Sequence, residues 1–322
     1  MSQMACMDNE GLFHRAVVMS AMIRSPYQVG GIGVPEELWH AEENGQHFLS
    51  FLGCSTIEQA RKLDAAAIRD KYEEYTKIFP AMFTVLDHKF CVGDPMVLFM
   101  EGKHVNVPVM SGNTSDEFPS YIEASSKEDL KKKAEEIFGK NAETFLRFPE
   151  AMREDSDGKY AKVNGIECTI KCLFSDKKSA GEKKPYYYYR FDSDIPGWDN
   201  AGTFHSVDLW FFFETLAKCW RPFVGQHYDL SRMMCNYWVN FIKTGDPNGN
   251  DADGKPMPYW YPYEKEKPCE MIFMSDRPVV NCGWVTPFKE FLQEQIKKTL
   301  STGSDQNSWN VKKGDYNEQV KD

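Results

Sequence analysis

Short apolar segments alternate with amphipathic segments along almost the whole chain. Four apolar segments have the length of a strand and lie at residues 16–20, 105–111, 186–191 and 270–275. The segments between them are longer and repeat their apolar residues at helical spacing. Strands separated by helices predict an α/β fold, in which helices cover a largely parallel sheet. A hydrophobic content of 42% is enough to build the core of such a fold, which excludes general disorder.

Helix-start and helix-stop residues mark the expected helices. Pro35 occupies a first-turn position in a helix expected over 35–52, and Ser55-x-x-Glu58 forms a capping box for the next. A third helix is expected over 228–243, and Gly245 ends it.

The C-terminal part of the chain follows the same logic. Thr286 and Pro287 begin a closing helix that reaches Leu300, and residues 301–322 form a polar tail. A charged section over 125–184 opens with the capping box Ser125-x-x-Glu128 and is interpreted as a helical, lid-like layer. The domain itself is expected to span residues 1–300.

Charge and cysteine content exclude several classes of protein. Lys plus Arg number 38 against 48 Asp plus Glu, so the net charge of −10 makes nucleic acid an unsuitable partner. No apolar run reaches membrane-spanning length. The nine cysteines form no disulfide framework by spacing, which favours a reducing, cytoplasmic compartment. They also lack the paired spacing of a metal site, and no strand is followed by a phosphate-binding glycine loop, so we expect neither metal nor cofactor.

Glu117 and His205 each follow a predicted core strand. The carboxyl ends of neighbouring parallel strands lie at one edge of a sheet, so these two side chains can meet there. A carboxylate bonded to an imidazole fixes its tautomer and stabilises the imidazolium that a general base forms. The alternative is an ordinary surface-loop glutamate and a histidine at the start of a helix. Position alone leaves both possibilities open.

The chain contains no G-x-S-x-G sequence. In an α/β-hydrolase this motif forms the strained turn that presents the nucleophilic serine. Ser179-Ala180-Gly181 resembles part of it, but Lys177 and Lys178 precede it instead of a core strand, so it is interpreted as a loop.

Four segments, in order, resemble the C-terminal portion of type-B carboxylesterases, the α/β-hydrolase family that includes bacterial para-nitrobenzyl esterases and cholinesterases. The similarity extends from about residue 11 to residue 300. The segments are Gly11-Leu12-Phe13-His14-Arg15-Ala16-Val17, Val107-Pro108-Val109-Met110-Ser111-Gly112-Asn113-Thr114-Ser115-Asp116-Glu117, Gly202-Thr203-Phe204-His205-Ser206-Val207-Asp208-Leu209, and Thr244-Gly245-Asp246-Pro247-Asn248 followed by Trp260 and Pro262.

The resemblance implies an α/β-hydrolase fold and a role for each matching residue. Glu117 corresponds to the acid of the catalytic triad and His205 to its base, and Ser20 to a serine that supports the acid by hydrogen bonding. The implied activity is hydrolysis of a small carboxylic ester, without a cofactor. The residues next to the acid and base are expected to shape an apolar substrate pocket, namely Phe118, Tyr121, Trp210 and Phe211.

In this family the nucleophilic serine lies a short way before the Leu12-Phe13 pair, and the oxyanion loop lies further upstream. We therefore expect a chain that carries acid and base without the nucleophile, is inactive alone, and is complemented by an N-terminal fragment. Two alternatives remain open. One is a non-catalytic binding or adhesion protein, against which the retained Glu117 and His205 argue. The other is a truncated gene remnant.

Overall fold

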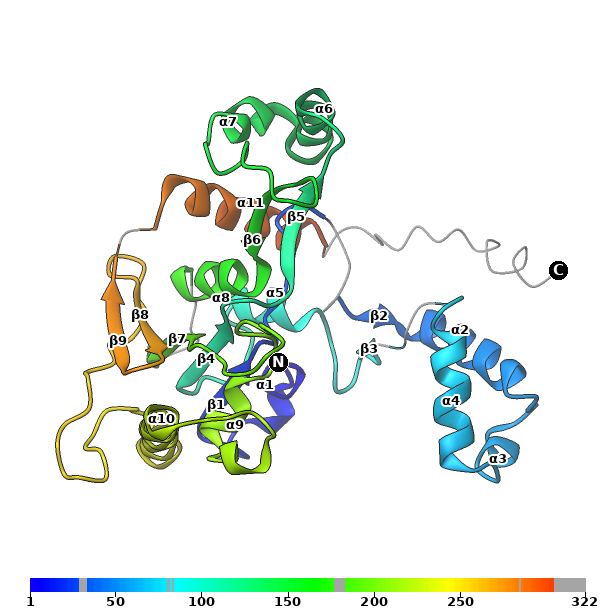
Figure 1. Cartoon of the computed structure of the whole chain (residues 1–322). Coiled ribbons are helices and arrows are strands. Elements are labelled where there is room, and N and C mark those ends of the chain that lie inside the picture. Colours follow the sequence, from blue (N-terminus) through cyan, green and yellow to red (C-terminus); the bar gives the residue numbers. More distant parts are fainter. Residues whose placement is uncertain (29–33, 80–81, 83, 177–182, 284, 304–322) are drawn as a thin grey trace.

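The computed structural model describes residues 1–28, 34–79, 82, 84–176, 183–283 and 285–303. A five-stranded sheet with the order β1-β4-β7-β8-β9 lies at its centre (Figure 1). Its strands are β1 (Ala16–Met19), β4 (Val109–Thr114), β7 (Tyr186–Asp192), β8 (Cys269–Met274) and β9 (Pro278–Cys282). The strands from β1 to β8 pair in parallel, and β9 is antiparallel to β8. The predicted α/β architecture is confirmed.

Helices cover both faces of the sheet, as the four consecutive tyrosines of β7 require. Successive side chains of a strand point to opposite faces. Tyr186 and Tyr188 pack into one hydrophobic cluster, and Tyr187 and Tyr189 into the other. The first cluster is closed by α5 (Pro95–Met100), α8 (Gly165–Ser175) and α11 (Pro287–Gly303), and the second by α9 (Asp208–Phe212) and α10 (Gly225–Thr244).

A helical unit projects from this body, at the right of Figure 1. It comprises β2 (Glu36–Glu37), α2 (Leu38–Phe51), α3 (Ile57–Ala60), α4 (Ala65–Tyr75) and β3 (Val85–Leu86), with β2 and β3 paired in parallel. Tyr75 is fully buried, and its ring lies 5.1 Å from that of Phe48 and 4.6 Å from that of Phe79. The unit therefore has a small aromatic core of its own.

The section between β4 and β7 includes residues 125–184, for which a helical, lid-like layer was expected. It contains an antiparallel pair, β5 (Pro119–Glu123) and β6 (Lys159–Asn164), and two peripheral helices, α6 (Lys127–Phe138) and α7 (Ala142–Leu146). The following α8 is almost wholly buried against the main sheet, so only α6 and α7 form a peripheral layer. The remaining elements are α1 (Ser2–Ala5) and the 3-10 turns Met7–Asn9, Gly139–Asn141 and Leu216–Lys218.

Four predicted helix starts are wrong by one to three residues. The helix expected from Tyr228 begins at Gly225. The helix expected from Pro35 begins at Leu38, because Glu36 and Glu37 pair with β3. Thr56, not Ser55, caps α3, and its side chain accepts a hydrogen bond from the Gln59 amide. The cap of α6 is likewise one residue later than predicted. Ser126, not Ser125, caps the helix, and its side chain accepts a hydrogen bond from the Asp129 amide.

Two helix ends agree with the sequence. Gly245 ends α10 in the left-handed conformation, with φ 84°. Thr286 Oγ1 accepts from the amide of Lys289 at the start of α11.

The strand expected over 105–111 instead runs from Val109 to Thr114. The sequence analysis interpreted Gly112-Asn113-Thr114 as loop because the residues are polar. All three are buried, and the Asn113 side chain is bonded internally: Tyr188 donates its hydroxyl to Asn113 Oδ1 at 2.7 Å, and Asn113 Nδ2 donates to the Thr114 carbonyl at 2.9 Å. Satisfied polar groups can lie within a buried strand.

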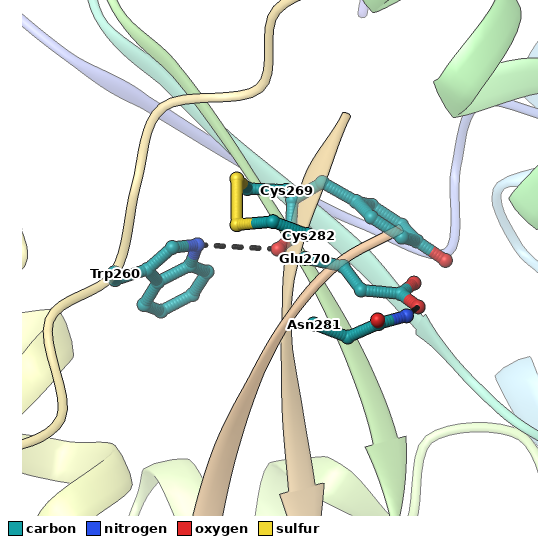
Figure 2. Close-up of a disulfide and its surroundings, with 6 residues drawn as sticks. Trp260, Cys269, Glu270, Asn281 and Cys282 are labelled. Carbon is teal, nitrogen blue, oxygen red and sulfur yellow. Dashed lines mark hydrogen bonds between the residues drawn. A yellow bond between two sulfur atoms is a disulfide. The ribbon is translucent and has the colours of Figure 1, made fainter. Parts of the chain in front are cut away.

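The cysteine prediction is wrong at one pair. Cys269 and Cys282 face each other across β8 and β9 and form a disulfide (Figure 2). Strand β9 had no separate prediction. The figure also shows Trp260 beside this pair. The Trp260 indole N–H donates to the Tyr188 carbonyl at 3.2 Å. The other seven cysteines are free thiols. A disulfide is typical of oxidising surroundings and is at odds with the reducing compartment favoured from composition.

Among the described residues, no helix combines the length and apolar character needed to cross a membrane. The Ser179-Ala180-Gly181 loop and the predicted tail beyond Gly303 lie outside the described residues.

Candidate active site

Three strand ends bring Ser20, Glu117 and His205 together. Ser20 directly follows β1, Glu117 follows β4, and His205 follows the loop after β7. Because β1, β4 and β7 are parallel neighbours, their carboxyl ends lie at one edge of the sheet, where α/β proteins place ligands.

The Glu117 carboxylate is fully enclosed, with 0% of its side chain exposed. Its Oε1 accepts the Ser20 hydroxyl at 2.7 Å and the Thr114 amide at 2.9 Å. Its Oε2 contacts Nδ1 of His205. A buried carboxylate needs such partners, since an unpaired buried charge is very costly. The contacts orient it toward the imidazole.

The His205 ring faces the carboxylate on one side and solvent on the other. Its side chain is 45% exposed. Because a carboxylate only accepts hydrogen bonds, the contact assigns the proton of the neutral ring to Nδ1. The other nitrogen, Nε2, has no hydrogen-bond partner among the residues that the structure describes. It is therefore available to accept a proton.

The backbone is strained at each of these positions. Ser20 has φ 49°, Phe118 directly after Glu117 has φ 33°, and Ser206 directly after His205 has φ 69°. Residues other than glycine rarely adopt positive φ, and such strain concentrates at functional sites. The three turns hold the side chains at a fixed angle to their strand ends.

Asp116 ties the loop of Glu117 to the loop of His205, a contact that the sequence analysis missed. Its Oδ2 accepts from the backbone amide and the hydroxyl of Thr203, at 3.0 and 2.9 Å. Gly202 makes room for it, because a Cβ there would lie 2.7 Å from the same oxygen. Asp116 lies in the quoted segment 107–117 and Thr203 in the quoted segment 202–209, but nothing in their spacing indicates a contact.

A second buried carboxylate, Asp208, lies at the start of α9 and was also missed. Its Oδ2 accepts the hydroxyl of Tyr189 at 2.8 Å. Burial is the main reason that the pKa of Asp208 is raised to about 6, and the nearby Glu117 charge adds to the effect. Burial likewise raises the pKa of Tyr189 well above its usual value, so Tyr189 stays a donor.

A cavity of about 750 Å³ adjoins the pair through Phe118. The Phe118 ring lies 4.6 Å from the His205 ring, and both Phe118 and Tyr121 line the cavity. The other two residues expected in a pocket do not line it. Trp210 packs against Phe204 at 5.8 Å. Phe211 is fully buried in the core.

No group of three or more His, Cys, Asp or Glu side chains within the described ranges is arranged to hold a metal ion.

Comparison with known proteins bears on the family and the fold. The model of the carboxylesterase family matches residues 1–281. The rat bile salt-activated lipase is 24% identical over 80% of this chain and 47% of its own length. Rat neuroligin-2 is 24% identical over 74% of this chain and 32% of its own length. A solved para-nitrobenzyl (PNB) esterase superposes with a TM-score of 0.59 at 22% identity, over 89% of this chain and 59% of the other.

The chain thus spans about half the length, or less, of these curated relatives. The structural likeness supports the α/β-hydrolase fold predicted from the sequence. The family match covers most of the residues that the structure describes. This chain belongs to the carboxylesterase family.

Proposed function

We propose that this chain supplies the acid and the base of a serine-type carboxylic ester hydrolase. The observation that carries the proposal is the contact of the buried Glu117 carboxylate with Nδ1 of His205, while the opposite side of the ring is open. Family membership supports ester hydrolysis as the reaction class.

The proposed reaction follows from the orientation of the ring. Nε2 of His205 takes the proton of a serine hydroxyl as the serine attacks the ester carbonyl, and then returns it to the departing alcohol. Glu117 stabilises the imidazolium that forms in between. Water, activated by the same nitrogen, then hydrolyses the acyl-enzyme. Ser20 is a positioning residue, since its hydroxyl donates to the Glu117 carboxylate and reaches the imidazole only through it.

The nucleophile is assigned to a complementing segment that bears G-x-S-x-G, because the 322 residues contain no such motif. That segment must present its serine to Nε2 of His205 and supply the oxyanion donors. The cavity lined by Phe118 and Tyr121 is proposed to receive part of a small carboxylic ester.

Covalent labelling tests the proposal. A fluorophosphonate probe reacts with a serine only when a working base activates it. We expect the complementing segment, combined with this chain, to be labelled at its G-x-S-x-G serine. His205→Ala should abolish labelling, while His88→Ala, at an exposed position just after β3, should leave it unchanged. Equal labelling with His205→Ala would contradict the assignment of the base.

A binding or adhesion role is the second candidate, and the similarity to a neuroligin favours it. The enclosed Glu117 argues for catalysis, because a binding surface has no chemical need for a buried carboxylate held against an imidazole. Labelling that fails in every combination would favour the binding role.

A further inference from the structure

An exposed aromatic stack lies beside the loop that leads to His205. The rings of Trp198 and Trp220 are 4.2 Å apart with an interplanar angle of 36°. The guanidinium carbon of Arg221 lies 4.6 Å from the Trp220 ring and 5.4 Å from the ring of Phe204. Phe204 immediately precedes His205, so the stack connects the outer surface with the residue beside the proposed base.

The stack is held rigidly from below. The Arg221 side chain is only 6% exposed and donates two hydrogen bonds to Asp199, at 2.9 and 2.7 Å, and one to the carbonyl of Pro196 at 3.1 Å. Gly197 allows this packing, because a Cβ there would lie 2.6 Å from Arg221 Nη1 and 3.2 Å from the Trp220 ring. A fixed platform loses little conformational entropy when a ligand binds.

Core packing does not account for Trp198. Its exposed fraction of 86% is the highest among the large apolar side chains of the described residues, and that of Trp220 is 54%. Neighbouring apolar side chains that are exposed to water and held in a fixed arrangement indicate a binding site. The proposed hydrolysis uses neither indole.

We propose that Trp198 and Trp220 form a platform that binds an uncharged aromatic ring of the ester substrate. The inference rests on the proposed function, since it takes the ligand to be that of the same site. Flat indole faces stack favourably on planar rings.

The chemistry of the surroundings selects an uncharged aromatic ring over other ligands. A sugar needs free hydrogen-bonding groups beside the stacking face, whereas the guanidinium of Arg221 and the carboxylate of Asp199 are already bonded to each other. A charged ligand finds no unpaired counter-charge at the stack, because the Arg221 guanidinium over the Trp220 ring is neutralised by its ion pair with Asp199.

Ligand-observed NMR titration of the full chain with two probes tests the platform. The probes are ethyl benzoate and ethyl cyclohexanecarboxylate, which share the ester and the carbon skeleton and differ in aromaticity. We expect Trp198→Ala and Trp220→Ala each to weaken ethyl benzoate binding about two- to tenfold and the other ester less. Trp198→Phe should retain most of the affinity.

Trp39→Ala is the matched control, because Trp39 is 51% exposed on the separate helical unit and should not affect binding. Unchanged affinity in Trp198→Ala, equal loss for the two esters, or no binding of ethyl benzoate to the unmodified chain would each overturn the platform. The readout needs no turnover, so His205→Ala should bind ethyl benzoate like the unmodified chain. If the serine is not labelled but the preference for ethyl benzoate is observed, the proposed hydrolysis is contradicted and the aromatic platform is supported.

Discussion

The carboxylate of Glu117 contacts the imidazole of His205 although 88 positions separate the two residues in the sequence. The contact depends on β4 and β7, which pair in parallel from Val109 opposite Tyr186 to Thr114 opposite Phe191. It depends equally on the bonds between Asp116 and Thr203, which join the loops beyond those strands. Sheet topology and one loop contact together position the acid against the base.

Removing the Ser20 hydroxyl takes one donor from a buried carboxylate. We expect Ser20→Ala to lower the free energy of unfolding by about 1.5–3 kcal/mol, the range for a hydrogen bond to a charged group. Urea unfolding measures the change. Ser50→Ala is the control, since the exposed Ser50 hydroxyl bonds only a carbonyl within α2. Equal stability of the Ser20 and Ser50 variants would contradict the role of Ser20.

Gly112 is required by the close approach of Tyr189. A Cβ at Gly112 would lie 2.3 Å from the Tyr189 ring, in the middle of the paired strands β4 and β7. We expect Gly112→Ala to destabilise the fold by about 3 kcal/mol or more, since the ring has no room to move in a packed core. Gly45→Ala on α2 meets no atom within 4 Å and should be neutral or stabilising by about 0.5–1 kcal/mol. Thermal unfolding of the two variants gives the comparison, and similar melting temperatures would contradict it.

The disulfide between Cys269 and Cys282 closes a loop with a sequence separation of 13. For a loop of this size, the loss of the cross-link is expected to cost about 3 kcal/mol of folding stability. Unfolding of the oxidised chain, compared with a Cys269→Ala/Cys282→Ala double variant, measures it. Alkylation of the denatured, unreduced chain should modify seven cysteines and leave these two unmodified. Modification of all nine would show that the bond is absent.

Asp208 gives stability a distinct dependence on pH. Burial raises its folded-state pKa to about 6, above the unfolded value near 3.8. Between these values the folded state binds more protons, so this group makes stability fall as pH rises from about 4 to about 6. Asp208→Asn keeps an acceptor for Tyr189 but cannot ionise.

We therefore expect Asp208→Asn to gain stability relative to the unmodified chain as pH rises across this window, by roughly 2–3 kcal/mol in total. Urea unfolding at several pH values between 4 and 7 provides the measurement. A stability difference that stays constant over this range would contradict a raised pKa for Asp208.

The strand pattern was sufficient to predict the α/β sheet. Together with the segments 107–117 and 202–209, it also predicted the positions of Glu117 and His205 at neighbouring strand ends. Tyr186–Asp192 was predictable because apolar and aromatic residues fill both faces of that strand. Residues 112–114 were not, because the buried Asn113 side chain accepts a hydrogen bond from Tyr188, a partner 75 positions away. The Cys269–Cys282 bond and the Asp116–Thr203 contact are equally tertiary. The local sequence pattern does not indicate which distant residues will be in contact.

The residues expected to line the pocket were likewise only partly predictable from the sequence. Phe118 and Tyr121, which lie one and four positions after Glu117, line the cavity beside the pair, whereas Phe211, six positions after His205, is buried in the core. Phe211 packs in the same core cluster as Leu230, Met234 and Tyr237 of α10, a tertiary contact that sequence position does not reveal.

Hydrolysis of a short-chain para-nitrophenyl ester tests the central claim most directly. The 322-residue chain would be assayed alone and in combination with a G-x-S-x-G-bearing segment, each with and without His205→Ala. The account predicts activity only in the combination with His205 intact, and a loss on the order of 10⁴–10⁶ in rate without it. Activity of the combination that persists undiminished in His205→Ala would contradict the assignment of Glu117 and His205 as acid and base.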